Sequence, residues 1–275
     1  MGSVVWAACV SHAGGQLRVR RSDTEQEKID RVYAAWETLH DSLAEANPDV
    51  LVVVGTDHMY TFSFDLMPIL TIGRGPSFET WGELGNAKRE IAGNAELADA
   101  LHAALVADGF DVAGMAGMRL DHSFASPLAF LDPEEGLPVL PLAVNTFARP
   151  LPSFARCRAF GGALARAIAD QSLAPRVAVV ATGGISHSVG RPDTGRINPD
   201  WDRAFLKCFE QPDLEHLDAI SEADFVTGGG PGAGELACWM VALGATGAAP
   251  SRCLVYEPVD AWITGIALVQ IEVAK

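Results

Sequence analysis

Four of the seven histidines directly follow a serine or an aspartate, and imidazole can bind a metal or carry a proton: His12, His58, His122 and His187. Three of these pairs close a strongly apolar run, whereas Asp121-His122 lies in a loop-like stretch. Apolar runs of this length are typical of buried strands in a parallel sheet. Because ligands gather at the carboxyl ends of such strands, we expect His12, His58 and His187 to meet at one edge of the sheet. Three imidazoles there indicate a metal centre or an acid/base centre.

A metal centre at this edge would also need an anionic ligand. Glu235 is the candidate, because it opens an apolar helix, and the N-terminus of a helix favours a carboxylate. The glycines of segment 227–234 would let the backbone approach a crowded centre. Together with His12 and His58, this carboxylate would form the facial arrangement that leaves positions open on non-haem Fe(II). The alternative is that the histidines are hydrogen-bonded structural residues and that Glu235 only balances the helix dipole.

Regular elements must position these side chains. A helix over 24–46 has apolar residues at helical spacing and connects the strands that precede His12 and His58, which predicts a β-α-β unit with parallel strands. Further strands are expected at 67–72, 137–144, 176–181, 253–257 and 263–273, and helices at 95–108, 153–171, 198–208, 215–223 and 235–243. The sequence therefore predicts an α/β fold, a single domain over residues 1–275 with a layered helix–sheet–helix architecture and a mostly parallel central sheet.

Composition and charge exclude several classes of partner. Hydrophobic residues make up 49% of the chain, which is typical of a globular protein. The net charge of -15 argues against binding to nucleic acid or to an anionic membrane. The five cysteines show no CxxC spacing, which favours free thiols in a reducing compartment. Because the sequence also shows no signal peptide and no membrane span, we expect a cytoplasmic protein.

A small anionic substrate remains compatible with this charge, because a single local arginine can hold it. Arg18, Arg20 and Arg21 follow His12 closely and could bind a substrate carboxylate. The alternative is that these arginines are simply solvated.

Several short segments, taken in their order and spacing, resemble a known family. The segments are Ser11-His12; Asp57-His58 followed by 62–68; Asp121-His122 with 123–128; 141–146 with 150–152; 183–187; 198–202; and Gly234-Glu235 before Trp239. With these pieces the chain resembles the class III extradiol ring-cleaving dioxygenases, of the protocatechuate 4,5-dioxygenase catalytic-subunit and 2,3-dihydroxyphenylpropionate dioxygenase type. The resemblance covers nearly the whole chain.

The resemblance implies specific roles. His12, His58 and Glu235 would be the ligands of Fe(II), His187 would be an acid/base beside the substrate, and His122 a second acid/base or a residue of the oxygen pocket. The implied substrates are O2 and a catechol, or a 2-aminophenol analogue, cleaved to a semialdehyde acid. Which of His122 and His187 is the base stays open. The family also implies a homo-oligomer, and some members need a small second subunit.

Two other functions remain open from the sequence. A zinc-dependent hydrolase on a related scaffold would also use two histidines and a carboxylate. A non-catalytic metal-binding homologue is the third reading, but it would need neither His122 nor His187.

Overall fold

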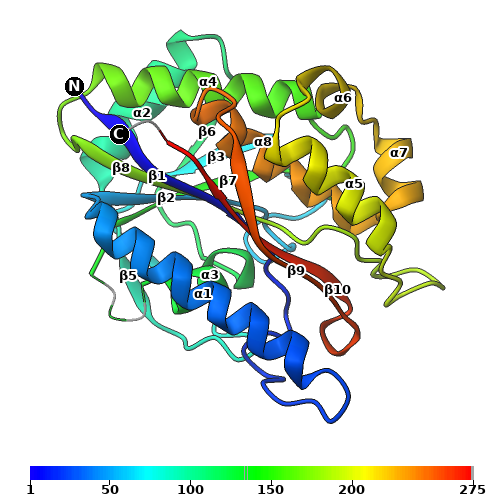
Figure 1. The fold of residues 1–275 in the computed structure, drawn as a ribbon. Coiled ribbons are helices and arrows are strands. Elements are labelled where there is room, and N and C mark those ends of the chain that lie inside the picture. The colour runs from blue at the N-terminus through cyan, green and yellow to red at the C-terminus, as the bar shows by residue number, and fades with distance from the viewer. Residues whose placement is uncertain (133, 135, 274–275) are drawn as a thin grey trace.

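The core of the structure is one sheet of eight strands that includes segments from both ends of the chain (Figure 1). The computed structural model describes residues 1–132, 134 and 136–273. The strands of this sheet are β1 (Ser3–Val10), β2 (Val50–Gly55), β3 (Leu70–Gly73), β6 (Ala113–Met115), β7 (Val139–Val144), β8 (Arg176–Thr182), β9 (Ser251–Val259) and β10 (Thr264–Ile271). Their order across the sheet is β6-β3-β7-β2-β8-β1-β10-β9. Two short strands, β4 (Ser77–Glu79) and β5 (Glu90–Ala92), form a separate antiparallel pair.

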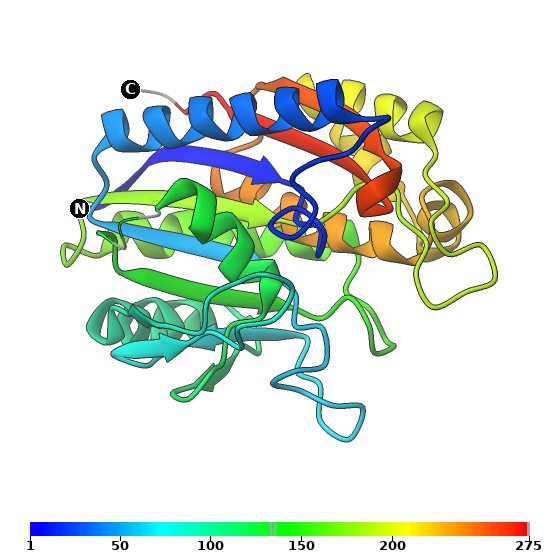
Figure 2. The same ribbon diagram turned by 90° about the horizontal axis from the view of Figure 1, so that it is seen from below.

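The centre of the sheet is parallel, as the apolar runs predicted. Strands β7, β2, β8 and β1 pair in parallel, and Figure 2 shows them running side by side in one direction. The strands of the expected β-α-β unit are parallel, but β8 lies between them. The antiparallel pairing of β1 with β10 and of β10 with β9 completes the sheet on one side. On the other side, β3 pairs antiparallel with β7 and parallel with the edge strand β6. The predicted α/β fold with a mostly parallel central sheet is therefore confirmed.

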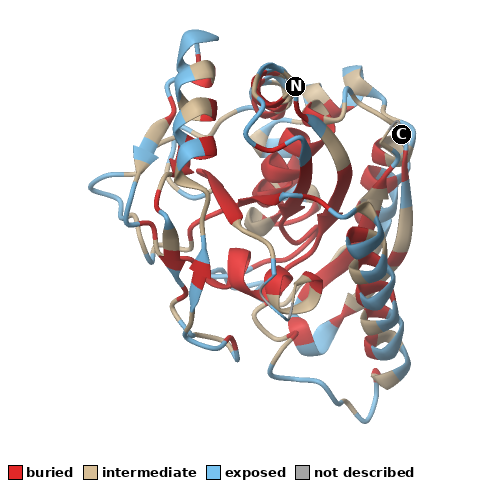
Figure 3. Cartoon of the chain, turned by 90° about the vertical axis from the view of Figure 1, so that its left-hand side faces the viewer, coloured by how far each residue is buried: buried red, intermediate tan, exposed pale blue. Residues whose placement is uncertain are grey.

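Helices cover both faces of the sheet, which explains why the central strands are apolar on both sides (Figures 1 and 3). On one face lie α1 (Gln26–Ala46) and α3 (His122–Leu131). On the other face lie α2 (Ala95–Ala107), α4 (Phe154–Asp170), α5 (Pro199–Glu210), α6 (Leu214–Ala219), α7 (Glu222–Gly228) and α8 (Leu236–Ala245). In the part of the chain described, no helix is both long and apolar enough to cross a membrane.

Glu235 begins an apolar helix, as expected: it is the N-cap residue of α8 and also the last residue of the 3₁₀ helix η1 (Pro231–Glu235). Two other local expectations are wrong. The helix expected at 215–223 is two helices, α6 and α7, because Ser221 starts a new helix through a capping box with Asp224. The stretch around Asp121-His122 is not a loop, because the Asp121 side chain accepts a hydrogen bond from the backbone N–H of Ser123 and caps α3.

Helices α4 and α8 approach each other closely at two glycines. A Cβ atom at Gly161 would collide with the carbonyl oxygen of Val241, and one at Gly244 would collide with the carbonyl oxygen of Arg158. Both clashes are with backbone, which cannot move aside as a flexible side chain can. This contact fixes α8, and with it the adjoining Glu235, against α4.

A Gly161→Ala variant is therefore expected to lower the free energy of unfolding by about 1–3 kcal/mol. Gly162→Ala is the matched control in the same helix, since the nearest atom to its Cβ is a terminal nitrogen of Arg166 at 3.6 Å. The control should gain up to about 1 kcal/mol from helix propensity. Urea unfolding of both variants measures the difference, and equal stability of the two would show that the helices can separate without cost.

Candidate metal centre and active site

The predicted histidines meet at the carboxyl end of the parallel strands. His12 follows β1, His58 follows β2 and His187 follows β8, and all three line one cavity of about 850 Å³. His122, at the start of α3, and Glu235, at the end of η1, line the same cavity. The structure therefore brings together all five residues that the sequence singled out.

Glu235 lies at the centre of this group. Its Oε2 is 3.5 Å from Nε2 of His12, and its Oε1 is 3.2 Å from Nε2 of His58. Ligand atoms about 2.0–2.2 Å from one metal ion lie roughly 3.0–3.5 Å apart, so these spacings fit a shared ion. Nε2 of His12 is buried, and no described residue offers it a hydrogen-bond partner. A metal ion beside Glu235 would satisfy this nitrogen.

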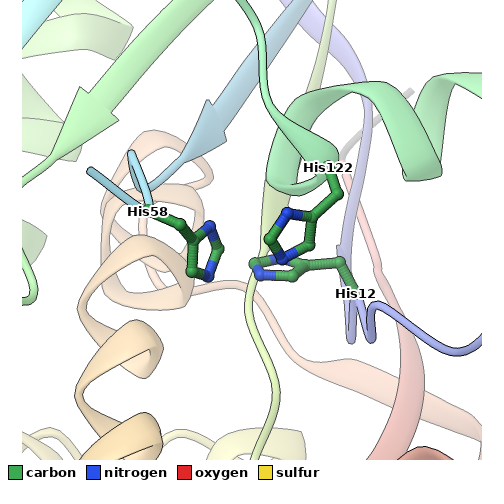
Figure 4. A group of neighbouring side chains, drawn as sticks. All are labelled: His12, His58 and His122. Carbon is green, nitrogen blue, oxygen red and sulfur yellow. The ribbon is translucent and has the colours of Figure 1, made fainter. Parts of the chain in front are cut away.

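A second set of ligand atoms is also close enough to hold a metal. The nearest ring nitrogens of His12, His58 and His122 lie within 4.8 Å of one another, and Figure 4 shows the three imidazoles facing a common point. The ring of His122 stacks on His58 with 4.1 Å between centroids. Both sets share His12 and His58, so they differ in whether Glu235 or His122 completes the site.

Hydrogen bonds hold the rings of His12 and His58 in position. Nδ1 of His12 bonds to the hydroxyl of Thr182 at 3.1 Å, and Nδ1 of His58 bonds to Asp121 at 3.0 Å. The same Asp121 oxygen accepts the backbone N–H of His58 at 2.6 Å. Such outer partners leave Nε2 of each ring facing the centre, as metal ligation requires.

The titratable groups of the site respond to burial and to one another. Burial lowers the pKa of His12 to about 3, although Glu235 opposes this. Burial also lowers the pKa of His58, but Asp121 and Glu235 outweigh it and raise that pKa to about 10, so a bound metal ion would have to displace a proton from this imidazole. Burial raises the pKa of Glu235, yet interactions with His12 and His187 and hydrogen bonds with His187 and His58 keep it well below its usual range. The carboxylate is thus ionised and can act as the anionic ligand.

Known proteins resemble this chain over nearly its whole length. The family model described as the catalytic LigB subunit of aromatic ring-opening dioxygenase matches residues 6–267. The chain belongs to this family. The class III extradiol dioxygenase predicted from the sequence is thereby confirmed, and the match is to ring-opening enzymes rather than to the hydrolases that were the alternative.

Individual relatives agree with the family. The 2,3-dihydroxyphenylpropionate/2,3-dihydroxicinnamic acid 1,2-dioxygenase of Klebsiella pneumoniae is 29% identical over 305 aligned positions, which cover 94% of this chain and 95% of that protein. The protein of the same name from Escherichia coli K12 is 28% identical over the same shares. An uncharacterized protein of Escherichia coli K12, JW3007, has a crystal structure that superposes with a TM-score of 0.66 at 17% identity. It covers 98% of this chain and 100% of that one, and this likeness shows the fold alone.

Glycines enclose the ring of His187 in this dioxygenase. A Cβ atom at Gly184 would lie 2.7 Å from Nδ1 of His187, and one at Gly232 would collide with the same ring. The ring also lies near the carboxylate, with Nε2 3.6 Å from Oε1 of Glu235. The expected role of the glycine-rich segment, close approach of the backbone to a crowded centre, is therefore confirmed.

Asp202 is a buried residue whose position the sequence did not predict. It accepts hydrogen bonds from the Ser186 backbone N–H at 2.9 Å, the Ser186 hydroxyl at 2.7 Å and the Tyr256 hydroxyl at 2.6 Å. Burial raises the pKa of Asp202 to about 6 against the effect of these donors. The network fixes the residue that precedes His187. The only sequence signal was the segment 198–202, which carried the resemblance without a structural reason.

Proposed function

We propose that this enzyme uses Fe(II), held by His12, His58 and Glu235, to cleave a catechol that carries an acidic side chain. The observation that carries the proposal is the buried Glu235 carboxylate between two imidazole Nε2 atoms in the cavity. Two imidazole nitrogens, once free of protons, and one carboxylate leave positions open on the ion for a diol and for O2. When bound, the iron supplies a path for electrons between the two substrates.

The two remaining imidazoles have proton chemistry to perform. A catechol must lose protons to bind as an anion, and a later step returns a proton to a leaving oxygen. His187 and His122 both line the cavity outside the proposed ligand set. We assign the proton-accepting and proton-donating tasks to these two residues, since each has a ring nitrogen close to the proposed ligands.

The cavity has room and charge for a substituent on the ring. Its volume of about 850 Å³ is near the upper end of the range for small-molecule sites. Three arginines line it: Arg149 pairs with Glu222, Arg191 lies near Asp193, and Arg18 has no ion pair with any described residue. The names of the relatives give carboxylic acids as their substrates. These observations support Arg18 as the residue that attracts the acidic group, whereas Arg20 and Arg21 do not line the cavity.

An Arg18→Gln variant should therefore raise KM for 2,3-dihydroxyphenylpropionate by about 10-fold and leave KM for unsubstituted catechol unchanged. The effect is moderate because the residue is exposed and water screens its charge. Arg20→Gln is the matched control on the same segment. Steady-state kinetics with both substrates provide the test, and an equal change in KM for the two would show that Arg18 does not recognise the side chain.

The reaction itself can be tested directly. We would reconstitute the protein with Fe(II) without air and follow O2 uptake with protocatechuate, gallate, 2,3-dihydroxyphenylpropionate and 2-aminophenol. Uptake together with a yellow ring-fission product supports the proposal. If the protein binds stoichiometric iron but takes up no O2 with any diol, the proposal is wrong for this chain acting alone. Addition of candidate small subunits then tests whether the predicted second subunit is needed. Tightly bound zinc together with hydrolytic activity would instead favour a zinc-dependent hydrolase.

We also propose that the protein is a homo-oligomer and that it is cytoplasmic. Light scattering on the purified protein measures its oligomeric state. The cytoplasmic location is supported by the five cysteines, all of which are free thiols.

A further inference from the structure

Glu83 lies in the segment between β4 and β5, and it contacts His122 twice. One oxygen, Oε1, accepts the backbone N–H of His122 at 2.5 Å and lies 3.1 Å from Nδ1 of the same residue. We propose that Glu83 is a positioning residue that fixes the tautomer of His122, with the proton on Nδ1 and the lone pair of Nε2 available for proton transfer. This inference rests on the proposed role of His122 in the reaction.

Hydrogen-bond chemistry determines the tautomer. Oε1 of Glu83 already accepts the backbone N–H of His122 and thus acts as an acceptor, so Nδ1 of His122 is the donor in the second contact. A neutral imidazole has a single N–H, and Nε2 is then left as an acceptor.

The same arrangement occurs at the neighbouring histidine. One oxygen of Asp121 accepts both the backbone N–H and Nδ1 of His58, as Glu83 does for His122. The two imidazoles are neighbours in Figure 4 and stack with 4.1 Å between their centroids. Two adjacent rings are thus each hydrogen-bonded to a carboxylate. His187 differs, because its buried Nδ1 has no hydrogen-bond partner in the described residues.

The backbone around Glu83 is held on several sides. The N–H of Trp81 bonds to the carbonyl of Leu120 at 2.9 Å, and the side-chain amide of Asn86 donates to the Ser126 hydroxyl in α3 at 3.0 Å. Leu84 has φ of 54°, an uncommon value for a residue with a side chain, and it packs where a Cβ of Gly14 would otherwise fit. A strained, well-anchored turn beside the site is what precise placement of one carboxylate requires.

The other oxygen of Glu83 supports a role beyond helix capping. Oε2 is buried and has no hydrogen-bond partner among residues 1–132, 134 and 136–273. A carboxylate that only capped the start of α3 could do so from an exposed position, without burying its second oxygen. An unsatisfied buried oxygen beside the cavity carries a cost, which functional placement explains.

The test compares Glu83→Ala with Glu79→Ala, which changes an exposed glutamate of β4. Glu83→Gln is the rescue variant, because its amide oxygen can accept both N–H groups of His122 as Oε1 of Glu83 does, so it should recover most of the activity lost in Glu83→Ala. We expect the kcat of Glu83→Ala to fall by about 10- to 100-fold, with KM changed less than threefold and iron retained. The control should keep the wild-type kcat.

A second readout does not depend on turnover. Long-range ¹H–¹⁵N spectra of the metal-free protein report the tautomer of each histidine, and a His122→Asn variant assigns the signal. The wild type should show His122 protonated at Nδ1, Glu83→Ala should lose this preference, and Glu83→Gln should keep it. A wild-type His122 protonated at Nε2, or an unchanged kcat in Glu83→Ala, overturns the inference. If instead the wild type turns over no catechol, the proposed function fails while the tautomer measurement still decides the role of Glu83.

Discussion

A Glu235→Gln variant is expected to fold and to lose its metal. Glutamine matches the carboxylate in size, but it carries no charge, and its amide nitrogen cannot coordinate. The two remaining ligands, His12 and His58, are a pair of imidazoles that alone bind a divalent ion weakly. Because even outer-shell changes cost 10- to 100-fold in metal affinity, we expect the loss of this ligand to weaken Fe(II) binding by at least about 100-fold. Metal analysis after desalting of the reconstituted protein measures the loss.

His122→Asn is the matched control for this experiment, because it separates the two ligand sets that the geometry allows. With Glu235 as the third ligand, His122→Asn keeps stoichiometric iron and loses only turnover. With His122 as the third ligand, the pattern reverses: the histidine variant loses iron and Glu235→Gln retains it. Circular dichroism of both metal-free variants confirms that a loss of iron is not a loss of fold.

The apolar strands and the residues at their ends could be predicted from the sequence because the signal is local. A parallel strand covered on both faces must be a continuous apolar run, and the chain positions directly after it face the ligand-binding edge. His12, His58 and His187 follow from this argument alone. The order of the strands did not follow, since nothing in the apolar pattern indicates that β8 pairs between β1 and β2.

The residues that orient the site could not be predicted, because they are distant in sequence from what they hold. Glu83 is 39 positions from His122, and Thr182 is 170 positions from His12. Each is an ordinary polar residue in its own segment, and only the folded contact gives it a role. The break between α6 and α7 is different: Ser221 followed by Asp224 is a local capping signal, and it was readable.

Removal of the imidazole of His187 should separate metal binding from catalysis. His187→Ala is expected to keep its iron, because the proposed ligands are His12, His58 and Glu235. The turnover number should fall by about 10²- to 10⁴-fold, which is the usual contribution of a positioned acid or base. Iron content and kcat, measured on the same preparation, give both results.

The exposed His216 of α6 provides the control, since His216→Ala removes an imidazole that does not line the cavity and should leave both quantities unchanged. Turnover by His187→Ala within threefold of the wild type would refute the acid/base role. Loss of iron in this variant would instead place His187, whose Nε2 is 3.6 Å from Glu235, among the groups that hold the metal. Retained iron with lost turnover would show that the imidazole acts on the substrate, because a protein that only binds metal has no use for it.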